Sequence, residues 1–212
     1  MQQCGRPLGS VALVAASKAQ PVDRIRALAA LGQRRFGENY LQEARPKMDG
    51  CVDLDLEWHF IGALQSNKAA DIAQHFDWVH TVASRSVAQR LSQARGSQRP
   101  PLNVCLQVNI EGEASKSGVA LQDAAELARA VADLPGLSLR GLMTIPAPAR
   151  DFDAQRRPFR ALRELLDRLR GQGLTLDTLS MGMSGDLEAA VAEGATLVRV
   201  GTALFGPRPA RR

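Results

Sequence analysis

The sequence predicts an α/β fold, a (β/α)₈ barrel of the TIM type that forms a single domain over residues 1–212. Short β-rich runs alternate with helical stretches from one end of the chain to the other, and eight such runs can be recognised. No linker, low-complexity tract or internal repeat divides the chain, whose length suits one domain. A doubly wound sheet is the alternative, because a shortage of helix at one end would leave the sheet open.

The expected strands are rich in β-branched and apolar residues and lie at 11–17, 34–38, 57–62, 78–83, 102–110, 138–145, 178–182 and 196–201. Between them apolar residues recur at helical spacing, as at Ile25, Leu28 and Ala29, and again at Leu162, Leu165, Leu166 and Leu169. Typical helix starts separate the elements, namely Pro21, Asn67, Ser84 and the turn at 184–186. This order predicts a parallel sheet covered by helices.

The two ends of the chain offer little room for helix. After the eighth strand the chain soon reaches Gly206 and Pro207, so we expect no eighth helix there. Residues 1–10 include Gly5, Pro7 and Gly9, which disfavour a helix before the first strand. We therefore expect the usual N-terminal helix to be absent, either because the natural start lies upstream or because a partner fills the groove.

Composition excludes several classes of protein. The net charge of +5 comes from arginines spread along the chain, and aromatic residues make up only 4%, which favours a solvated surface over nucleic-acid binding. Cys4, Cys51 and Cys105 show no metal-ligand spacing and predict a reducing compartment without structural disulfides. No apolar run reaches the roughly 18 residues of a membrane helix and no signal peptide is apparent. We expect a cytoplasmic protein that binds neither membranes nor metals.

Polar residues follow nearly every expected strand, where the functional residues of a barrel lie. They are Lys18, Asn39, Gln65, Asn67, Asn109, Thr144, Ser184, Gly201 and Thr202. Lys18 follows an apolar strand, where desolvation favours the neutral amine that attacks a carbonyl, although a surface lysine is the alternative.

Two small-residue loops predict an anion site. Residues 180–186 place a serine at a strand-to-helix turn, and Gly201-Thr202 follows the next strand. Loops after strands seven and eight are the usual phosphate site of this fold. Arg199 lies within an apolar run, so it needs a partner, either a neighbouring carboxylate or the ring nitrogen of a ligand.

Seven ordered segments carry a family resemblance. They are AASKAQP around Lys18, RFGENYLQEA at 35–44, EWHFIGALQSNK at 57–68, VNIEGEASKSG at 109–118, GLMTI at 141–145, LSMGMSGDLEAA at 179–190 and VRVGTALFG at 198–206. Together they closely resemble the pyridoxal phosphate homeostasis proteins, which are similar to the N-terminal barrel of bacterial alanine racemases and of eukaryotic-type ornithine decarboxylases.

The resemblance implies a cofactor and its ligands. Lys18 would carry pyridoxal 5'-phosphate (PLP) as a Schiff base, with Arg199 as the partner of the pyridine nitrogen. The resemblance assigns the phosphate to Ser184, Gly201 and Thr202, the cofactor face to Asn39, and ring packing to Met143 and Met181. His59 is expected to be structural, and Lys116 to be a solvated loop residue, with a role in receiving or releasing PLP as the alternative.

The expected function is therefore to buffer PLP and deliver it to apo-enzymes, without catalytic residues or turnover. Tyr40 is the only tyrosine, and the tyrosine base that alanine racemases bring from a second domain has no counterpart in these residues. An amino-acid racemase-like PLP enzyme is the alternative function, and a barrel that binds another phosphorylated metabolite or an RNA is a further one. We expect a monomer or a weak dimer, and transient contacts with PLP-dependent apo-enzymes.

Overall fold

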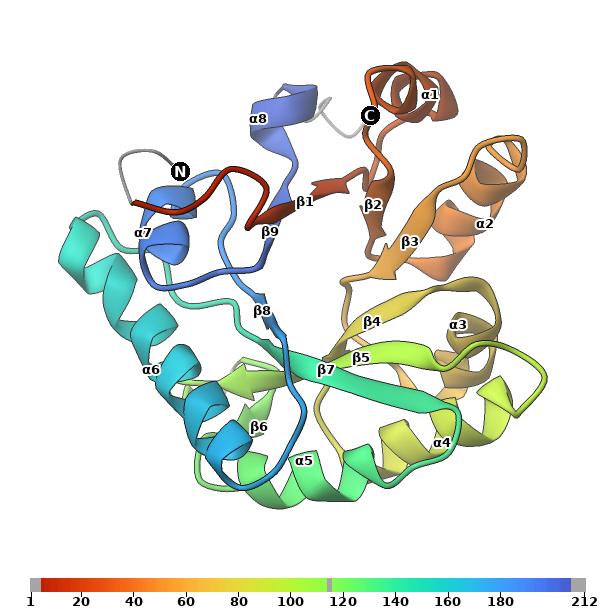
Figure 1. Ribbon diagram of the computed structural model, residues 1–212. Coiled ribbons are helices and arrows are strands. Elements are labelled where there is room, and N and C mark those ends of the chain that lie inside the picture. Colours follow the sequence, from red (N-terminus) through yellow and green to blue (C-terminus); the bar gives the residue numbers. More distant parts are fainter. Residues whose placement is uncertain (1–4, 114–115, 207–212) are drawn as a thin grey trace.

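The chain forms a closed barrel of parallel strands. A computed structural model describes residues 5–113 and 116–206 (Figure 1). Strand β1 (Ala12–Ala16) pairs with β2 (Arg35–Glu38) on one side and with β9 (Leu197–Val200) on the other. The ring closes between β4 (Trp78–Val82) and β5 (Leu102–Asn109). The barrel prediction is therefore confirmed, and the doubly wound alternative is wrong because the eight-stranded ring of the described residues has no open edge.

Seven of the eight expected ranges contain a strand, and the range 138–145 covers all of β7 (Leu137–Met143) except its first residue. The other two strands of the ring are β3 (Glu57–Phe60) and β8 (Thr178–Ser180). The sequence did not predict β6 (Val119–Ala120), which pairs with β5 outside the ring. Its two residues are too few to show an alternating pattern.

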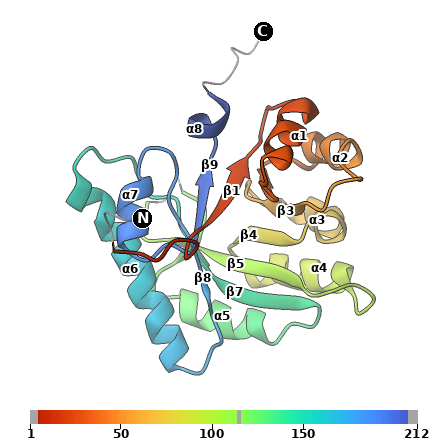
Figure 2. The ribbon, with the colours of Figure 1, turned by 45° about the horizontal axis from the view of Figure 1, so that its top comes forward.

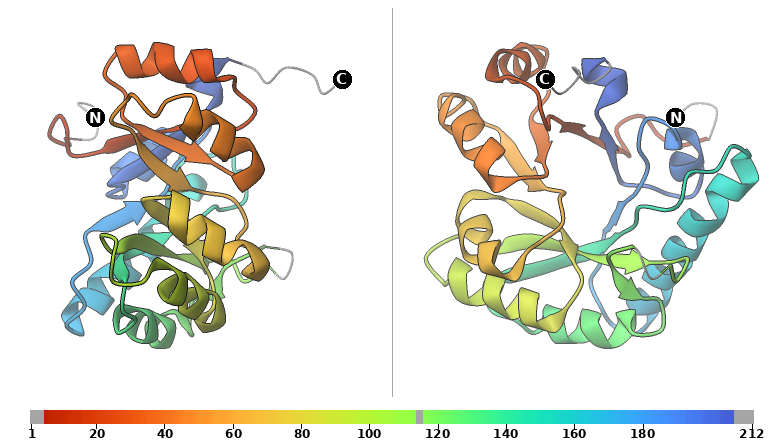
Figure 3. Two further views of the ribbon diagram at one scale, coloured as in Figure 1. Left: turned by 90° about the vertical axis from the view of Figure 1, so that its right-hand side faces the viewer. Right: turned by 180° about the vertical axis from the view of Figure 1, so that it is seen from behind.

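Helices surround the strands (Figures 1 and 3). They are α1 (Val22–Ala30), α2 (Leu41–Asp49), α3 (Ala69–His75), α4 (Arg85–Arg95), α5 (Ala124–Ala132), α6 (Phe152–Gly171), α7 (Leu187–Ala192) and α8 (Thr202–Phe205), with a 3-10 turn at Ser66–Lys68. Pro21 precedes α1, and Ser84 caps α4 by accepting a hydrogen bond from the Val87 N–H, as expected of these starts. None of the described helices has the length and apolar character that crossing a bilayer requires.

The two ends of the described chain only partly match expectation. Residues 5–10 form turns, while the first four residues and residues 207–212 lie outside the described part. The expectation of no helix after the eighth strand is wrong, because α8 forms one turn there. Thr202–Phe205 contains no helix breaker, so a single turn fits before Gly206 (Figure 2).

The barrel interior combines an apolar cluster with a polar one. Val14, Trp78, Cys105, Met143 and Leu197 pack together inside the ring, while the outward residues of the strands pack against the helices. The interior also holds four polar side chains that are at most 4% exposed, namely His59, His80, Ser180 and Arg199. Buried polar groups need partners, and these four provide them for one another.

Candidate functional site

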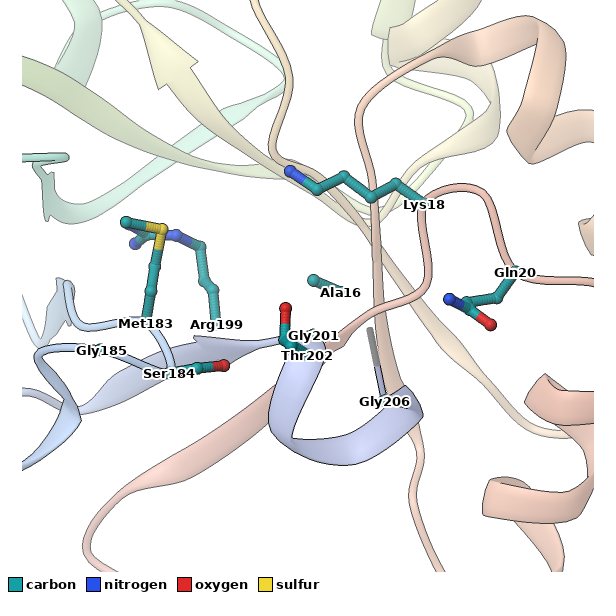
Figure 4. A pocket seen from close by; sticks show the side chains of 10 residues that line it. All are labelled: Ala16, Lys18, Gln20, Met183, Ser184, Gly185, Arg199, Gly201, Thr202 and Gly206. Carbon is teal, nitrogen blue, oxygen red and sulfur yellow. The ribbon is translucent and has the colours of Figure 1, made fainter. Parts of the chain in front are cut away.

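A pocket of about 200 Å³ opens at the end of the barrel where β1, β8 and β9 finish. Five of the seven predicted site residues line it: Lys18, Ser184, Arg199, Gly201 and Thr202. The others are Ala16, Gln20, Met183, Gly185 and Gly206. Met183 and Gly185 belong to the predicted anion loop 180–186, but none of the five was predicted individually. Figure 4 shows the Lys18 side chain extending across the pocket towards the side where Arg199 and Met183 lie.

The turn after β1 fixes the backbone of Lys18. The Gln20 N–H donates to the Ser17 carbonyl at 2.9 Å, and the Ala19 N–H donates to Oε2 of Glu43 at 3.3 Å. Ala19 has φ 58°, a left-handed conformation that costs an alanine roughly 1 kcal/mol. Such a conformation persists only where the surrounding structure imposes it. The lysine therefore extends from a tight turn that its neighbours hold in place.

A buried ion pair supports this turn from beneath, and no local pattern of residues predicted it. Lys47 Nζ donates to Glu38 Oε1 at 2.7 Å and to the Ser17 carbonyl at 2.9 Å. The Ser17 hydroxyl donates to the same carboxylate oxygen at 2.6 Å. Burial raises the pKa of Glu38, while the hydrogen bonds from Lys47 and Ser17 oppose that rise.

The loops after β8 and β9 meet at the opposite side of the pocket. The Ser184 hydroxyl accepts a hydrogen bond from the Ala203 N–H at 3.4 Å, which joins the two loops. Gly182 has φ +96°, and a Cβ there would lie 2.5 Å from that of Ala190. A Cβ on Gly201 would lie 3.3 Å from the Ala16 carbonyl, so a larger residue would crowd β1. Hydroxyl groups, together with a backbone that a ligand can approach closely, suit the binding of an anion such as phosphate.

The guanidinium of Arg199 lies at the base of the pocket and is anchored on two sides. Nη1 donates to the carbonyl and the hydroxyl of Ser180, both at 2.7 Å, and Nη2 donates to the Thr144 carbonyl at 3.0 Å. Burial lowers the pKa of Arg199 to about 10, so the group remains cationic at neutral pH. Over the described residues no carboxylate lies within 4.0 Å of it, so the alternative of a direct salt bridge is not seen.

Two predicted site residues lie elsewhere. Asn39 lines a neighbouring hollow of about 280 Å³ together with Thr81, Gln107 and Lys116. Its Oδ1 is buried and has no hydrogen-bond partner within the described chain, so it can accept a bond from a ligand. Met181 is fully buried in the core that faces the helices, and Met183 lines the pocket instead.

Comparison with known proteins identifies the family. Residues 2–209 match the family model described as alanine racemase, N-terminal domain. The pyridoxal phosphate homeostasis protein of Pseudomonas aeruginosa is 58% identical over 207 residues, which cover 98% of this chain and 89% of that protein. The chain belongs to the pyridoxal phosphate homeostasis family.

Solved structures agree with this assignment. PipY of Synechococcus elongatus PCC7942, solved with PLP bound, is 40% identical with a TM-score of 0.87 over 97% of this chain and 96% of that one. An alanine racemase from Corynebacterium glutamicum has a TM-score of 0.75, is 22% identical and covers 99% of this chain and 58% of that enzyme. The second likeness shows only that the family shares its fold with the racemase barrel.

The pocket residues of this family member define what chemistry is available. Lys18 and Arg199 are the two ionisable residues that line the pocket, and an arginine does not act as a base at neutral pH. Tyr40 is 54% exposed at the start of α2 and does not line the pocket. The described pocket therefore holds one amine that can attack a carbonyl, but no second base.

Proposed function

We propose that the chain binds PLP as a Schiff base on Lys18 and serves to store PLP and deliver it to apo-enzymes. The observation that carries the proposal is the convergence of a lysine amine, an anchored guanidinium and two hydroxyl-bearing loops on one pocket. PLP supplies an aldehyde for the amine and a phosphate for the loops. PipY, which is similar over almost its whole length, has been solved with PLP bound.

Each pocket residue has a proposed role. Ser184 and Thr202 would donate hydroxyl hydrogen bonds to the phosphate, and Gly201 would let the backbone approach it. Arg199 would face the pyridine nitrogen and keep it unprotonated, because a guanidinium only donates hydrogen bonds. Asn39 would offer its unpartnered Oδ1 to the cofactor face. A contact between Met181 and the ring stays a prediction, and Met183 is better placed to make one.

A carrier fits the pocket better than a catalyst. An unprotonated pyridine is a weak electron sink, and a racemase needs a second base opposite Lys18. The curated relatives are named for homeostasis of PLP, not for a reaction. We therefore propose binding without turnover, in a cytoplasmic monomer or weak dimer that meets apo-enzymes transiently.

The test is an absorbance spectrum of the purified protein after addition of PLP, before and after borohydride, beside Lys18→Ala. We expect a Schiff-base band that borohydride removes, with the pyridoxyl group found on Lys18 by peptide mass spectrometry. Lys18→Ala should lack the band because no other lysine of the described residues lines this pocket. Lys68→Ala, which removes a lysine outside the pocket, is the matched control.

Two outcomes would contradict the proposal. Reduction onto Lys116, in the neighbouring hollow, would move the covalent site away from Lys18. Racemisation of alanine or serine at a rate lost in Lys18→Ala would replace the carrier with the racemase alternative. An added amine that traps free PLP provides a test of delivery. Transfer of PLP to an apo-enzyme that is faster than this trapping would support delivery.

A further inference from the structure

The buried polar residues of the barrel interior form one continuous hydrogen-bonded chain. Arg199 Nη1 contacts Ser180 Oγ at 2.7 Å, and Ser180 Oγ contacts His80 Nδ1 at 2.7 Å. His80 Nε2 lies 2.9 Å from His59 Nδ1, and His59 Nε2 lies 2.8 Å from Glu57 Oε1. The chain runs from the pocket to the amino end of β3, at the opposite pole of the barrel.

The two ends of this chain fix the direction of every hydrogen bond. A guanidinium only donates, so Ser180 Oγ accepts from Arg199, and its own proton points to His80 Nδ1 because that nitrogen is the acceptor of a neutral ring whose proton is on Nε2. His80 then carries its proton on Nε2 and donates to His59 Nδ1. His59 carries its proton on Nε2 and donates to Glu57, which is a pure acceptor because its hydrogen bond with His59 lowers its pKa to about 2. The reverse direction would leave His59 with no proton to donate to the carboxylate.

The surroundings keep both imidazoles neutral and in place. Both histidines are fully buried, and burial lowers the pKa of each. The charged groups that act on His59 are Glu57, Arg35 and Asp77, and Arg199 acts on His80. The indole of Trp78 stacks on the His59 ring, with centroids 5.5 Å apart and planes 15° apart. The rings cannot turn without losing these contacts.

We propose that Ser180, His80 and His59 are positioning residues that hold the Arg199 guanidinium towards the pyridine nitrogen of PLP and link it to the Glu57 carboxylate. This inference rests on the proposed function. Arg199 has no direct carboxylate partner in the described chain, so the relay connects it to a negative charge at a distance. Aligned hydrogen bonds in a low-dielectric interior polarise one another. Removal of any one member should therefore weaken the hydrogen bond between Ser180 and Arg199.

The test compares Ser180→Ala, His80→Phe and the double variant with the wild type. We expect each single variant to shift the Schiff-base absorbance maximum in the same direction and to weaken PLP binding by about threefold to tenfold. The pH midpoint of the band should move by about half a unit or more, because Arg199 is no longer held against the ring. The double variant should bind PLP no more weakly than the weaker-binding single variant, since the residues act as a unit.

Two controls separate positioning from general loss of stability. Phe159→Leu alters the fully buried helix-facing core and should lower the melting temperature without changing the spectrum. His75→Gln removes the histidine that lies on α3, outside the barrel interior, and should change neither. The inference would be overturned if Ser180→Ala and His80→Phe were both less stable than the wild type but kept its absorbance spectrum and its affinity for PLP.

Nitrogen-15 NMR of the histidines, on protein without added PLP, tests the direction of the relay separately. We expect His59 and His80 to carry their protons on Nε2 from pH 6 to pH 8, and a proton on Nδ1 of His80 would overturn the assigned direction. Failure of the wild type to bind PLP would instead refute the proposed function and, with it, the role at the ring nitrogen. A wild-type band that is unchanged in the relay variants would refute the relay alone.

Discussion

At the scale of single residues, the position of Lys18 depends on its immediate backbone. Ala19 adopts φ 58° directly after it, and the Ala19 N–H is held by Glu43. A lysine has four rotatable side-chain bonds, so an ordered turn limits the volume that its amine can reach. The turn thus restricts the position of the amine that we propose as the nucleophile.

Ser184 is a proposed phosphate ligand whose contribution to PLP binding can be measured directly. We predict that Ser184→Ala weakens PLP binding by about threefold to tenfold, because one hydroxyl hydrogen bond to an anion is lost. The Schiff-base band should still form at saturating PLP, since Lys18 is untouched. Fluorescence titration with PLP measures the effect, and Ser86→Ala, an exposed serine on α4, serves as control. Equal affinities for wild type and Ser184→Ala would remove Ser184 from the phosphate site.

At the scale of elements, β1, β2 and α2 are joined by the buried group of Ser17, Glu38 and Lys47. Glu38 is fully buried and Lys47 is 7% exposed, so both charges are largely removed from water. A buried charge is tolerated only with its partners present. This group therefore couples the turn that carries Lys18 to the helix that follows β2.

We predict that Lys47→Met lowers the free energy of unfolding by about 2–4 kcal/mol at pH 8, because Glu38 would remain buried without its cation. The loss should shrink towards pH 5. Burial already raises the pKa of Glu38 in the folded state, and removal of Lys47 would raise it further, so the folded protein takes up a proton more readily than the unfolded chain. The stabilising effect of proton uptake by Glu38 is fully present below the pKa that Glu38 has in the unfolded chain. It is lost as the pH rises through the higher pKa that Glu38 has in the folded protein.

Urea denaturation at pH 5, 6.5 and 8 measures this dependence. Lys68→Met, a change in the 3-10 turn after β3, is the control and should show no added pH dependence. A loss in Lys47→Met that is constant over this range would mean that Glu38 does not take up the proton.

At the scale of the whole molecule, the closed barrel connects its two poles through its interior. Glu57 pairs with Arg35 at 2.9 Å at the amino end of the strands, and the buried relay leads from it to Arg199 at the carboxyl end. The apolar cluster around Val14 and Met143 surrounds only part of this interior. The polar part makes stability depend on the ionisation of a carboxylate far from the pocket.

We predict an acid-sensitive contribution from Glu57. The hydrogen bond with His59 lowers its pKa from 4.5 to about 2. The stability that it provides is therefore fully present above pH 4.5 and is lost as the pH falls towards 2. Because its side chain is 36% exposed, solvent screening should reduce the effect to about 1–2 kcal/mol.

Thermal unfolding of Glu57→Gln between pH 5 and pH 2.5 measures this contribution. The variant should be less stable than the wild type at pH 5 and should approach it as the pH falls. Glu164→Gln, which changes an exposed carboxylate on α6, is the control. Its stability should change with pH in the same way as that of the wild type over the whole range. A constant difference between Glu57→Gln and the wild type would contradict the assignment.

The sequence by itself determined the barrel and five of the ten residues that line the pocket. Parallel strands of a closed barrel all end at one pole, so residues that follow strands, such as Lys18, Ser184 and Thr202, must gather there. Strand-like runs and their order are local properties, which is why they could be predicted. The one-turn α8 and the two-residue β6 were missed because elements so short have no periodicity.

Only the tertiary structure decided which side chains face one another. Gly182, at φ +96°, redirects the chain after β8, so that Met181 faces the core and Met183 the pocket. The contact of His59 with His80 and of His80 with Ser180 depends on the register and stagger of β3, β4 and β8. Register between strands far apart in the chain is set by closure of the whole barrel, and no local pattern of residues encodes it.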